Sequence, residues 1–362
     1  SSEYLLGEAM DFPFDNLGNN NLGLGATPSK VNTDYYDKTL LSFFARANYS
    51  YQDKYMLSAS IRHEGSSKFA ADNRWANFWS ATAGWRISNE EFMKDFDWLD
   101  DLKIRFGYGV TGNNDFSATY MANMLGSDTN WMMPNGTWAY SYGKSQNVNP
   151  NLGWEEKKEW NLGVDYSFFE GRLYGKFDYY RREVDNLLFS VKVPQPPYTQ
   201  GSQMQNIGSM ESKGWEFEVG GDIIRTKDFT WSSSMNLSHN TGKILTLEGD
   251  NSYHNGNGFV APGTPGDAAR MEAGSTIGSF YMWKFAGFDD EGSFLLYNKD
   301  GEVIPAAQKT ENDKQYIGNY TPKLIIGWSH TLTYKNFDLG INLRSWIDFD
   351  VYNTINMYYG IQ

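Results

Sequence analysis

Alternation of apolar and polar side chains is the feature that most constrains what this chain can fold into. Residues 42–51 present one apolar and one polar face, with Phe44 as the exception. The apolar side chains are Phe43, Ala45, Ala47, Tyr49 and Tyr51, and the polar ones are Ser42, Arg46, Asn48 and Ser50. A period of two is typical of a β-strand with two unlike faces. The chain is therefore predicted to be all-β wherever the pattern continues.

The same alternation recurs along the chain and predicts an antiparallel sheet made of hairpins. It is found in residues 55–62, 80–87, 102–110, 160–168, 173–179, 215–223, 231–238, 277–288, 324–334 and 337–347. Alternating strand direction requires one more strand, for which residues 294–298 are the candidate, so we expect about 12 strands in this chain. Residues 1–40 and 111–153 show no period and predict long loops, and residues 89–100 predict a short helix.

The positions of the aromatic residues help to decide whether the apolar face meets lipid or a protein core. Rings bracket or follow four short turns, at Tyr51 and Tyr55, Phe169 and Tyr174, Phe229 and Trp231, and Tyr334 and Phe337. Rings beside short turns are typical of the interfacial girdle of a membrane barrel, with short periplasmic turns and long extracellular loops. Ordinary hairpin aromatics of a soluble all-β protein remain the alternative.

Composition limits the remaining classes of fold and function. The mean hydropathy is −0.59 and no apolar run reaches about 18 residues, so a membrane protein with this sequence must be a closed transmembrane β-barrel. A net charge of −13 argues against a nucleic-acid partner, and the absence of cysteine excludes disulfides and thiolate sites.

No motif predicts catalysis, a cofactor or a metal site. Residues 107–112 fit the dinucleotide fingerprint, but Asn113, Asn114 and Asp115 follow instead of a helix. The four histidines show no metal-ligand spacing. We therefore expect no enzyme activity.

Two groups of side chains are candidates for a binding site. The first comprises arginines on the polar face of the first four strands: Arg46, Arg62, Arg86 and Arg105. They predict either a charge-paired wall of a water-filled lumen or contacts to a plug or a solute. The second comprises rings in residues 111–153: Tyr120, Trp131, Trp138, Tyr140 and Tyr142. They predict either packing at the rim or contacts to a partner or a sugar.

Five segments together resemble a known family. They are LLSFFARANYSYQDKYMLSASIRHEGSSKF, WRISNEEFMKDFDWLDDLKIRFGYGVTGNN, NIGSMESKGWEFEV, IGSFYMWKFAGF and YKNFDLGINL. In this order they are similar to the barrel signatures of SusC/RagA-type TonB-linked outer-membrane transporters of Bacteroidota.

The resemblance implies a barrel of about 22 strands, an internal plug, energy from the TonB complex and a SusD-like lipoprotein at the barrel mouth. It implies active import of an oligomeric nutrient, a glycan or a peptide, across the outer membrane. Residues 1–362 are then expected to form a partial barrel domain without the plug, the TonB-contacting segment or a signal peptide. A secreted all-β carbohydrate-binding protein or glycosidase, and a surface protein that carries nothing, are the rival hypotheses.

Overall fold

A single curved sheet of ten strands dominates the computed structural model, which describes residues 2–10, 27–116, 125–247, 253–255 and 268–353. We call this sheet the wall. Its strands are β3 (Leu40–Tyr51), β4 (Tyr55–Ser66), β5 (Trp75–Arg86), β6 (Leu99–Asn113), β9 (Glu155–Phe168), β10 (Leu173–Asp185), β13 (Ser209–Arg225), β14 (Phe229–Thr246), β22 (Leu324–Tyr334) and β23 (Phe337–Ile347). Every wall strand is antiparallel to its neighbours, in the order β23-β22-β14-β13-β10-β9-β6-β5-β4-β3.

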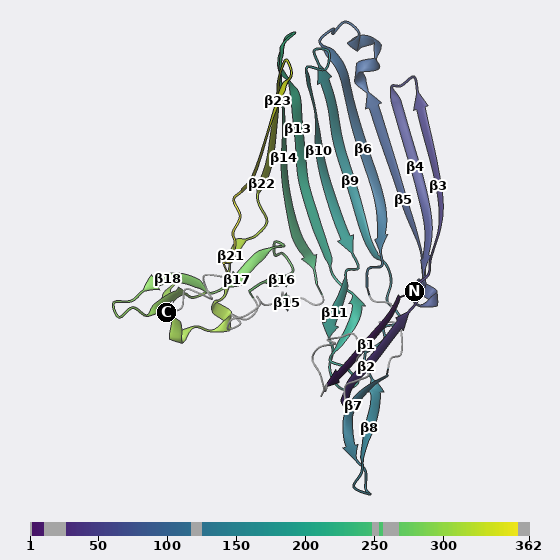
Figure 1. Cartoon of the computed structure of the whole chain (residues 1–362), viewed down its shortest axis with the longest axis vertical. Helices are drawn as coiled ribbons and strands as arrows, with labels where there is room; N and C mark the ends of the chain where they lie inside the picture. The colour runs from purple at the N-terminus through teal and green to yellow at the C-terminus, as the bar shows by residue number, and fades with distance from the viewer. Residues whose placement is uncertain (1, 11–26, 117–124, 248–252, 256–267, 354–362) are drawn as a thin grey trace.

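Short turns join four pairs of wall strands at one end of the sheet, where residues 87–98 form a longer connection between β5 and β6. Most of the long excursions leave the sheet at the other end (Figure 1). Gln52 and Asp53 both have φ 51°, and Phe169 and Glu170 have φ 58° and 57°. Two successive left-handed residues are typical of the type I′ hairpin turn, whose twist matches that of the paired strands. We refer to the two ends of the wall as the turn end and the loop end.

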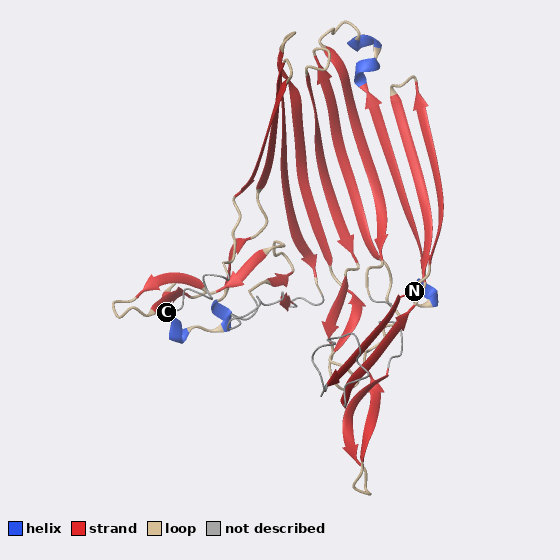
Figure 2. Cartoon of the chain, in the orientation of Figure 1, coloured by secondary structure: helices blue, strands red, loops and turns tan. Residues whose placement is uncertain are grey.

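Six smaller strand groups lie at the loop end, outside the wall (Figure 2). They are β1 (Ser2–Met10) with β2 (Thr27–Tyr36), β7 (Leu125–Met132) with β8 (Trp138–Lys144), β11 (Leu188–Lys192) with β12 (Ser202–Asn206), β15 (Tyr253–Asn255) with β16 (Arg270–Glu272), β17 (Ser279–Met282) with β21 (Gln315–Asn319), and the sheet of β18 (Lys284–Phe288), β19 (Phe294–Tyr297) and β20 (Val303–Pro305). The described helical segments are all short 3₁₀ turns: η3 (Ala71–Asn73), η4 (Ile87–Asn89), η5 (Glu91–Met93), η7 (Ala306–Gln308) and η8 (Glu311–Asp313).

Several expectations from the sequence need correction. The wall has ten strands rather than about 12, because residues 277–288 and 294–298 form β17, β18 and β19 in the smaller sheets. Residues 1–40 contain the β1–β2 hairpin instead of one long loop, and residues 111–153 contain the β7–β8 hairpin. The helix predicted in residues 89–100 is reduced to 3₁₀ turns, since β6 already begins at Leu99.

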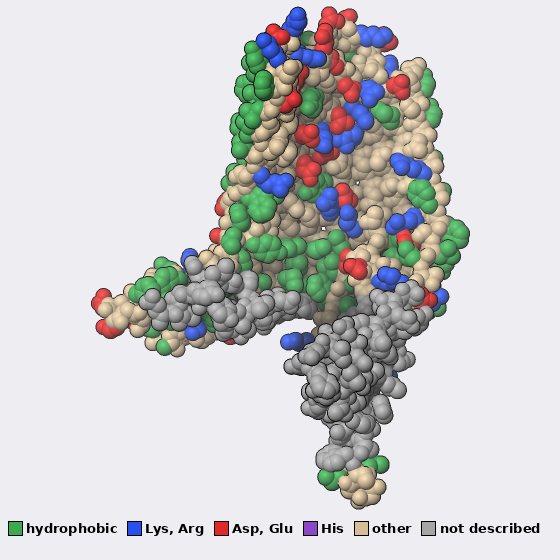
Figure 3. Space-filling model, in the orientation of Figure 1, with side chains coloured by type: hydrophobic (Ala, Val, Ile, Leu, Met, Phe, Trp, Pro, Cys, Tyr) green, Lys and Arg blue, Asp and Glu red, His purple; other side chains and the backbone are tan. Residues whose placement is uncertain are grey.

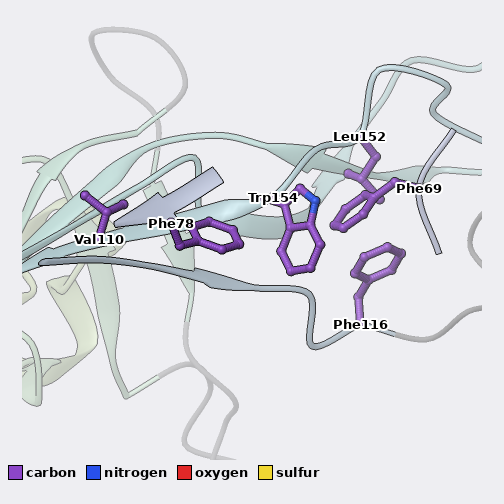
Figure 4. Packing of buried hydrophobic residues seen from close by; sticks show 6 residues of the cluster. All are labelled: Phe69, Phe78, Val110, Phe116, Leu152 and Trp154. Atoms are coloured by element: carbon purple, nitrogen blue, oxygen red, sulfur yellow. The ribbon is translucent and has the colours of Figure 1, made fainter. Parts of the chain in front are cut away.

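The main buried core lies at the loop end, where β5 and β6 separate. These two strands pair only from Ser80 to Arg86, and beyond Ser80 a cluster of apolar side chains packs beside them (Figure 4). The cluster consists of Phe69, Phe78, Val110, Phe116, Leu152 and Trp154. The Trp154 indole also donates to the Arg74 carbonyl at 3.1 Å. Packing and hydrogen bonding thus join the excursions after β4 and β6 to the start of β9.

Candidate functional site

Charged side chains gather on the hollowed, concave face of the wall (Figure 3). Arg105 on β6 reaches two aspartates on one side, Asp165 on the adjacent strand β9 and Asp178 on the next strand, β10. Its Nε and Nη2 donate to the two carboxylate oxygens of Asp165 at 2.8 and 2.9 Å, and Nη2 also donates to Asp178 at 3.1 Å. A two-point contact between guanidinium and carboxylate is geometrically selective. The three side chains thus tie β6, β9 and β10 together across the concave face.

Gly163 makes room for this ion-pair network. A Cβ atom at Gly163 would lie 2.6 Å from both Arg105 Nη2 and Asp178 Oδ1. Any side chain at this position would have to displace one of the two charged groups. The glycine therefore fixes where Arg105 can sit on the wall.

The other three predicted arginines also face the concave side, by strand register. Arg62 Nε lies 2.7 Å from Glu64 Oε2, and Arg86 Nε lies 3.1 Å from an oxygen of Asp101. Both are ion pairs by distance, although their alignment is not that of a hydrogen bond. Arg46 donates to the Ser58 hydroxyl at 3.2 Å. Three of the four arginines are therefore charge-compensated by carboxylates of the wall.

Further along the wall, charge pairs form rungs between directly opposed residues. Glu159 on β9 opposes Arg182 on β10 and accepts from its Nε at 2.9 Å. Lys176 on β10 opposes Glu218 on β13, with 3.1 Å between nitrogen and oxygen. Pairs with this exposure each contribute little to stability. Their combined effect is a polar concave surface whose charges are largely balanced.

Aromatic belts border the opposite, convex face. At the turn end, Tyr51 opposes Tyr55 and Tyr334 opposes Phe337. A second belt, which the positions of rings beside short turns did not predict, crosses the strands nearer the loop end. Its ring pairs are Trp79–Tyr108, Trp160–Tyr179 and Trp215–His239, with centroids 5.1, 5.5 and 6.1 Å apart. Two belts that flank an apolar band are typical of a transmembrane barrel.

Polarity on the convex face changes abruptly beyond the second belt. Arg181 opposes Trp160, and Lys158 opposes Glu183 in the next outward row.

One expectation about the turn-end belt is wrong. Tyr174 opposes Gly220 and Ser167 in the concave-facing set and so does not belong to the belt. Its place beside a short turn gave no information about which face it occupies.

The predicted loop rings fall mostly on one hairpin. Trp131 lies in β7, and Trp138, Tyr140 and Tyr142 lie in β8, which pairs with it. Tyr120 lies outside the described residues. The β7–β8 hairpin extends away from the wall at the loop end (Figure 1).

Asparagine side chains hold a second loop-end hairpin, β11–β12, in place, and they are not among the residues predicted from the sequence. The Asn147 amide donates to the carbonyls of Gln200 and Ser202 at 2.7 and 2.9 Å. Asn206 accepts from the Gly153 backbone N–H at 2.7 Å and donates to its carbonyl at 2.9 Å. These contacts join the segment before β9 to the hairpin. The dense asparagines of the NVNPN segment are the signal that could have indicated them.

A carboxylate joins two turns at the turn end. Glu90 accepts from the Tyr55 hydroxyl at 2.6 Å, from the Trp85 indole at 3.0 Å and from Lys54 at 3.1 Å. These donors, Tyr55 first, lower the pKa of Glu90 to about 2. The carboxylate therefore holds the β3–β4 turn against the segment that follows β5, beside the rings of Tyr55 and Trp85.

Neither a metal site nor a helical membrane span is found in the described part of the chain. Within those residues no group of three or more His, Asp or Glu side chains could hold a metal ion. No described helix is long and apolar enough to cross a membrane.

Comparisons with known proteins agree with this geometry. The sequence profile of the family described as "TonB dependent receptor-like, beta-barrel" matches residues 3–353. The TonB-dependent receptor SusC of Bacteroides thetaiotaomicron is 35% identical over an alignment of 326 positions that covers 87% of this chain and 32% of SusC. The TonB-dependent receptor P26 of Formosa agariphila is 32% identical over an alignment of 374 positions that covers 98% of this chain and 36% of that receptor.

The fold is also similar to that of a solved transporter. A chain in the structure of the RagAB peptide transporter superposes with a TM-score of 0.77 at 27% identity, covering 90% of this chain and 35% of that one. The present chain thus spans about a third of the length of the relatives that it matches.

Proposed function

This chain belongs to the TonB-dependent receptor β-barrel family, and from that premise we propose that the whole protein imports an oligomeric nutrient across the outer membrane. The observation that carries the proposal is the two-faced wall. Its convex face is apolar between two aromatic belts, and its concave face bears charge-balanced polar rungs. Such a wall, placed in the outer membrane, separates lipid from a hydrated lumen.

The soluble rival hypothesis fails on the convex face. A secreted all-β protein would have to cover these side chains, but Phe43, Leu57, Phe106 and Leu343 are each roughly half exposed there. No second layer of described residues packs on this band (Figure 1). The relatives are receptors rather than enzymes, and we propose that this protein has no catalytic activity.

We propose a glycan or a peptide as the cargo, with a SusD-like lipoprotein and the TonB complex as partners. RagAB is described as a peptide transporter, which supports the peptide alternative. Aromatic residues in the β7–β8 hairpin support the glycan alternative, because rings stack on sugars. In this proposal, the charge-paired arginines shape the lumen, and the loop-end hairpins are the surface that meets the lipoprotein.

Copurification tests the partner, and uptake tests the activity. Purification of the full-length receptor from outer membranes in mild detergent is expected to recover a SusD-like lipoprotein in near-equal amount. Cells lacking the receptor are expected to lose uptake of fluorescent oligosaccharides or of fluorescent peptides, but not of both. Loss of TonB should abolish the same uptake. Unchanged uptake of both probes, together with no associated lipoprotein, would contradict the proposal.

A further inference from the structure

From the convex face we infer a binding site for a single phospholipid of the periplasmic leaflet. A groove of about 570 Å³ opens on this face at the turn end, across β10, β13 and β14 and up to β22. Its lining is mostly apolar. Arg172 supplies an exposed cation at its turn-end margin, and Asp222, the other charged residue of the lining, accepts from the Ser232 hydroxyl at 2.7 Å. The inference depends on the outer-membrane placement of the barrel and not on what the barrel imports.

Two small residues create the groove. Gly221 on β13 and Ser233 on β14 oppose each other directly, so the lipid-facing surface has almost no side-chain volume at this point. Beside them the register shifts between Asp222 and Ile224. A bulge of this kind bends its strand locally. The sheet therefore carries a notch where its neighbours in the same band carry rings and branched side chains.

Large side chains border the notch and are held in place. The Trp328 indole donates to the Ser233 hydroxyl at 2.9 Å, which fixes the ring as one wall. Phe169 lies on the opposite border, in the β9–β10 turn, and Val219 and Met235 line the groove toward the centre of the apolar band. A groove with this mostly apolar lining fits an acyl chain better than it fits water.

Arg172 supplies the charge that a phospholipid needs. It follows the turn residues directly, and no described carboxylate lies within salt-bridge distance of its guanidinium, whereas the nearby Arg225 lies 3.6 Å from Asp222. Arginine binds phosphate oxygens with two parallel N–H groups. Because short turns of outer-membrane barrels face the periplasm, the guanidinium lies at the level of the phosphates of that leaflet. A lipid phosphate on Arg172 and its acyl chain over Gly221 and Ser233 would occupy both parts of the groove.

The test measures phospholipid retained by the full-length receptor. The receptor is purified in mild detergent, delipidated, incubated with vesicles of phosphatidylethanolamine and phosphatidylglycerol, and analysed by native mass spectrometry. Arg172→Gln is expected to lower the occupancy of the most tightly held lipid about tenfold, as loss of one charge-assisted contact implies. Ser233→Phe should abolish it by filling the notch, without any change in charge. Arg225→Gln is the matched control and should retain the lipid.

Three results would overturn the inference. They are wild-type retention by both Arg172→Gln and Ser233→Phe, equal loss in Arg225→Gln, and a receptor dimer that Ser233→Phe disrupts while the lipid count is unchanged. The last result would assign the groove to a second copy of the chain. Heat-modifiable migration on gels shows for each variant that the barrel has folded, so that reduced retention cannot reflect misfolding.

Discussion

At the scale of single residues, the ion pairs of Arg105 on the concave face depend on a glycine, Gly163. Arg105 can reach Asp178 as well as Asp165 because Gly163, which lies on β9 between Arg105 and Asp178, has no side chain. The sequence predicted that Arg105 faces the lumen, but not its partners. Those lie 60 and 73 positions away along the chain, and only the register of β6, β9 and β10 brings them together.

We predict that Gly163→Ala destabilises the barrel by about 1–3 kcal/mol, because the new methyl group must displace Arg105 or Asp178. The free energy of unfolding in urea, measured for the full-length receptor folded into liposomes, checks this. Gly107→Ala is the matched control on the same face. Its Cβ would approach only the Thr82 methyl group, at 3.4 Å, and equal destabilisation by both variants would contradict the steric argument.

The contacts of Glu90 predict how stability depends on pH at the turn end. The pKa of Glu90 is lowered from its ordinary value of 4.5 to about 2 in the folded protein, so folding favours the ionised carboxylate. The stabilisation is fully present above about pH 4.5 and is lost as the pH falls toward 2. We expect the urea midpoint of the wild type to fall over this range more than that of Glu90→Gln.

Glu170→Gln provides the control for this pH profile, since Glu170 is an exposed acid in another short turn. It should leave the wild-type profile unchanged. If Glu90→Gln loses stability as steeply as the wild type between about pH 5 and about pH 2.5, the prediction is wrong. The acid sensitivity would then come from other carboxylates.

At the scale of strands, alternation located all ten strands of the wall but also selected segments outside it. A period of two indicates that a strand has two unlike faces, but it does not indicate whether lipid or protein covers the apolar face. In β17, Phe280 is buried against the ring of Tyr320 within the loop-end structure, so its segment alternates without facing lipid. The β1–β2 hairpin was missed for the converse reason, because its residues show no apolar stripe.

The two aromatic belts predict how the cost of a buried charge varies with depth. Val164 lies on β9 midway between Phe168 and Trp160, in the middle of the apolar band, whereas Thr241 lies one convex position beyond His239 of the second belt. We expect Val164→Arg to destabilise the barrel in bilayers by about 2–4 kcal/mol and Thr241→Arg by about 0–1 kcal/mol. Guanidinium unfolding in phospholipid vesicles measures both, and equal costs would mean that the second belt does not mark the membrane boundary.

At the scale of the whole molecule, the wall is an open sheet with two edges. The outer sides of β3 and β23 have no strand partner among the described residues, and most side chains of both strands are exposed. Unpaired backbone groups cannot be left in lipid. Since the chain spans about a third of the length of its relatives, we expect further strands of the receptor to pair with these edges.

The opposite ends of the wall predict a topology that single cysteines can test, because the chain contains none of its own. Lys227 lies exposed in the β13–β14 turn, and Asp290 lies exposed between β18 and β19 at the loop end. If the short turns face the periplasm, a membrane-impermeant maleimide should label Asp290→Cys on intact cells and should label Lys227→Cys only after the outer membrane is permeabilised. Labelling of Lys227→Cys on intact cells would mean that the short turns face outward and that the barrel has the opposite orientation. The phosphate site at Arg172 would then face the outer leaflet, and the loop-end hairpins would be unable to meet a surface lipoprotein.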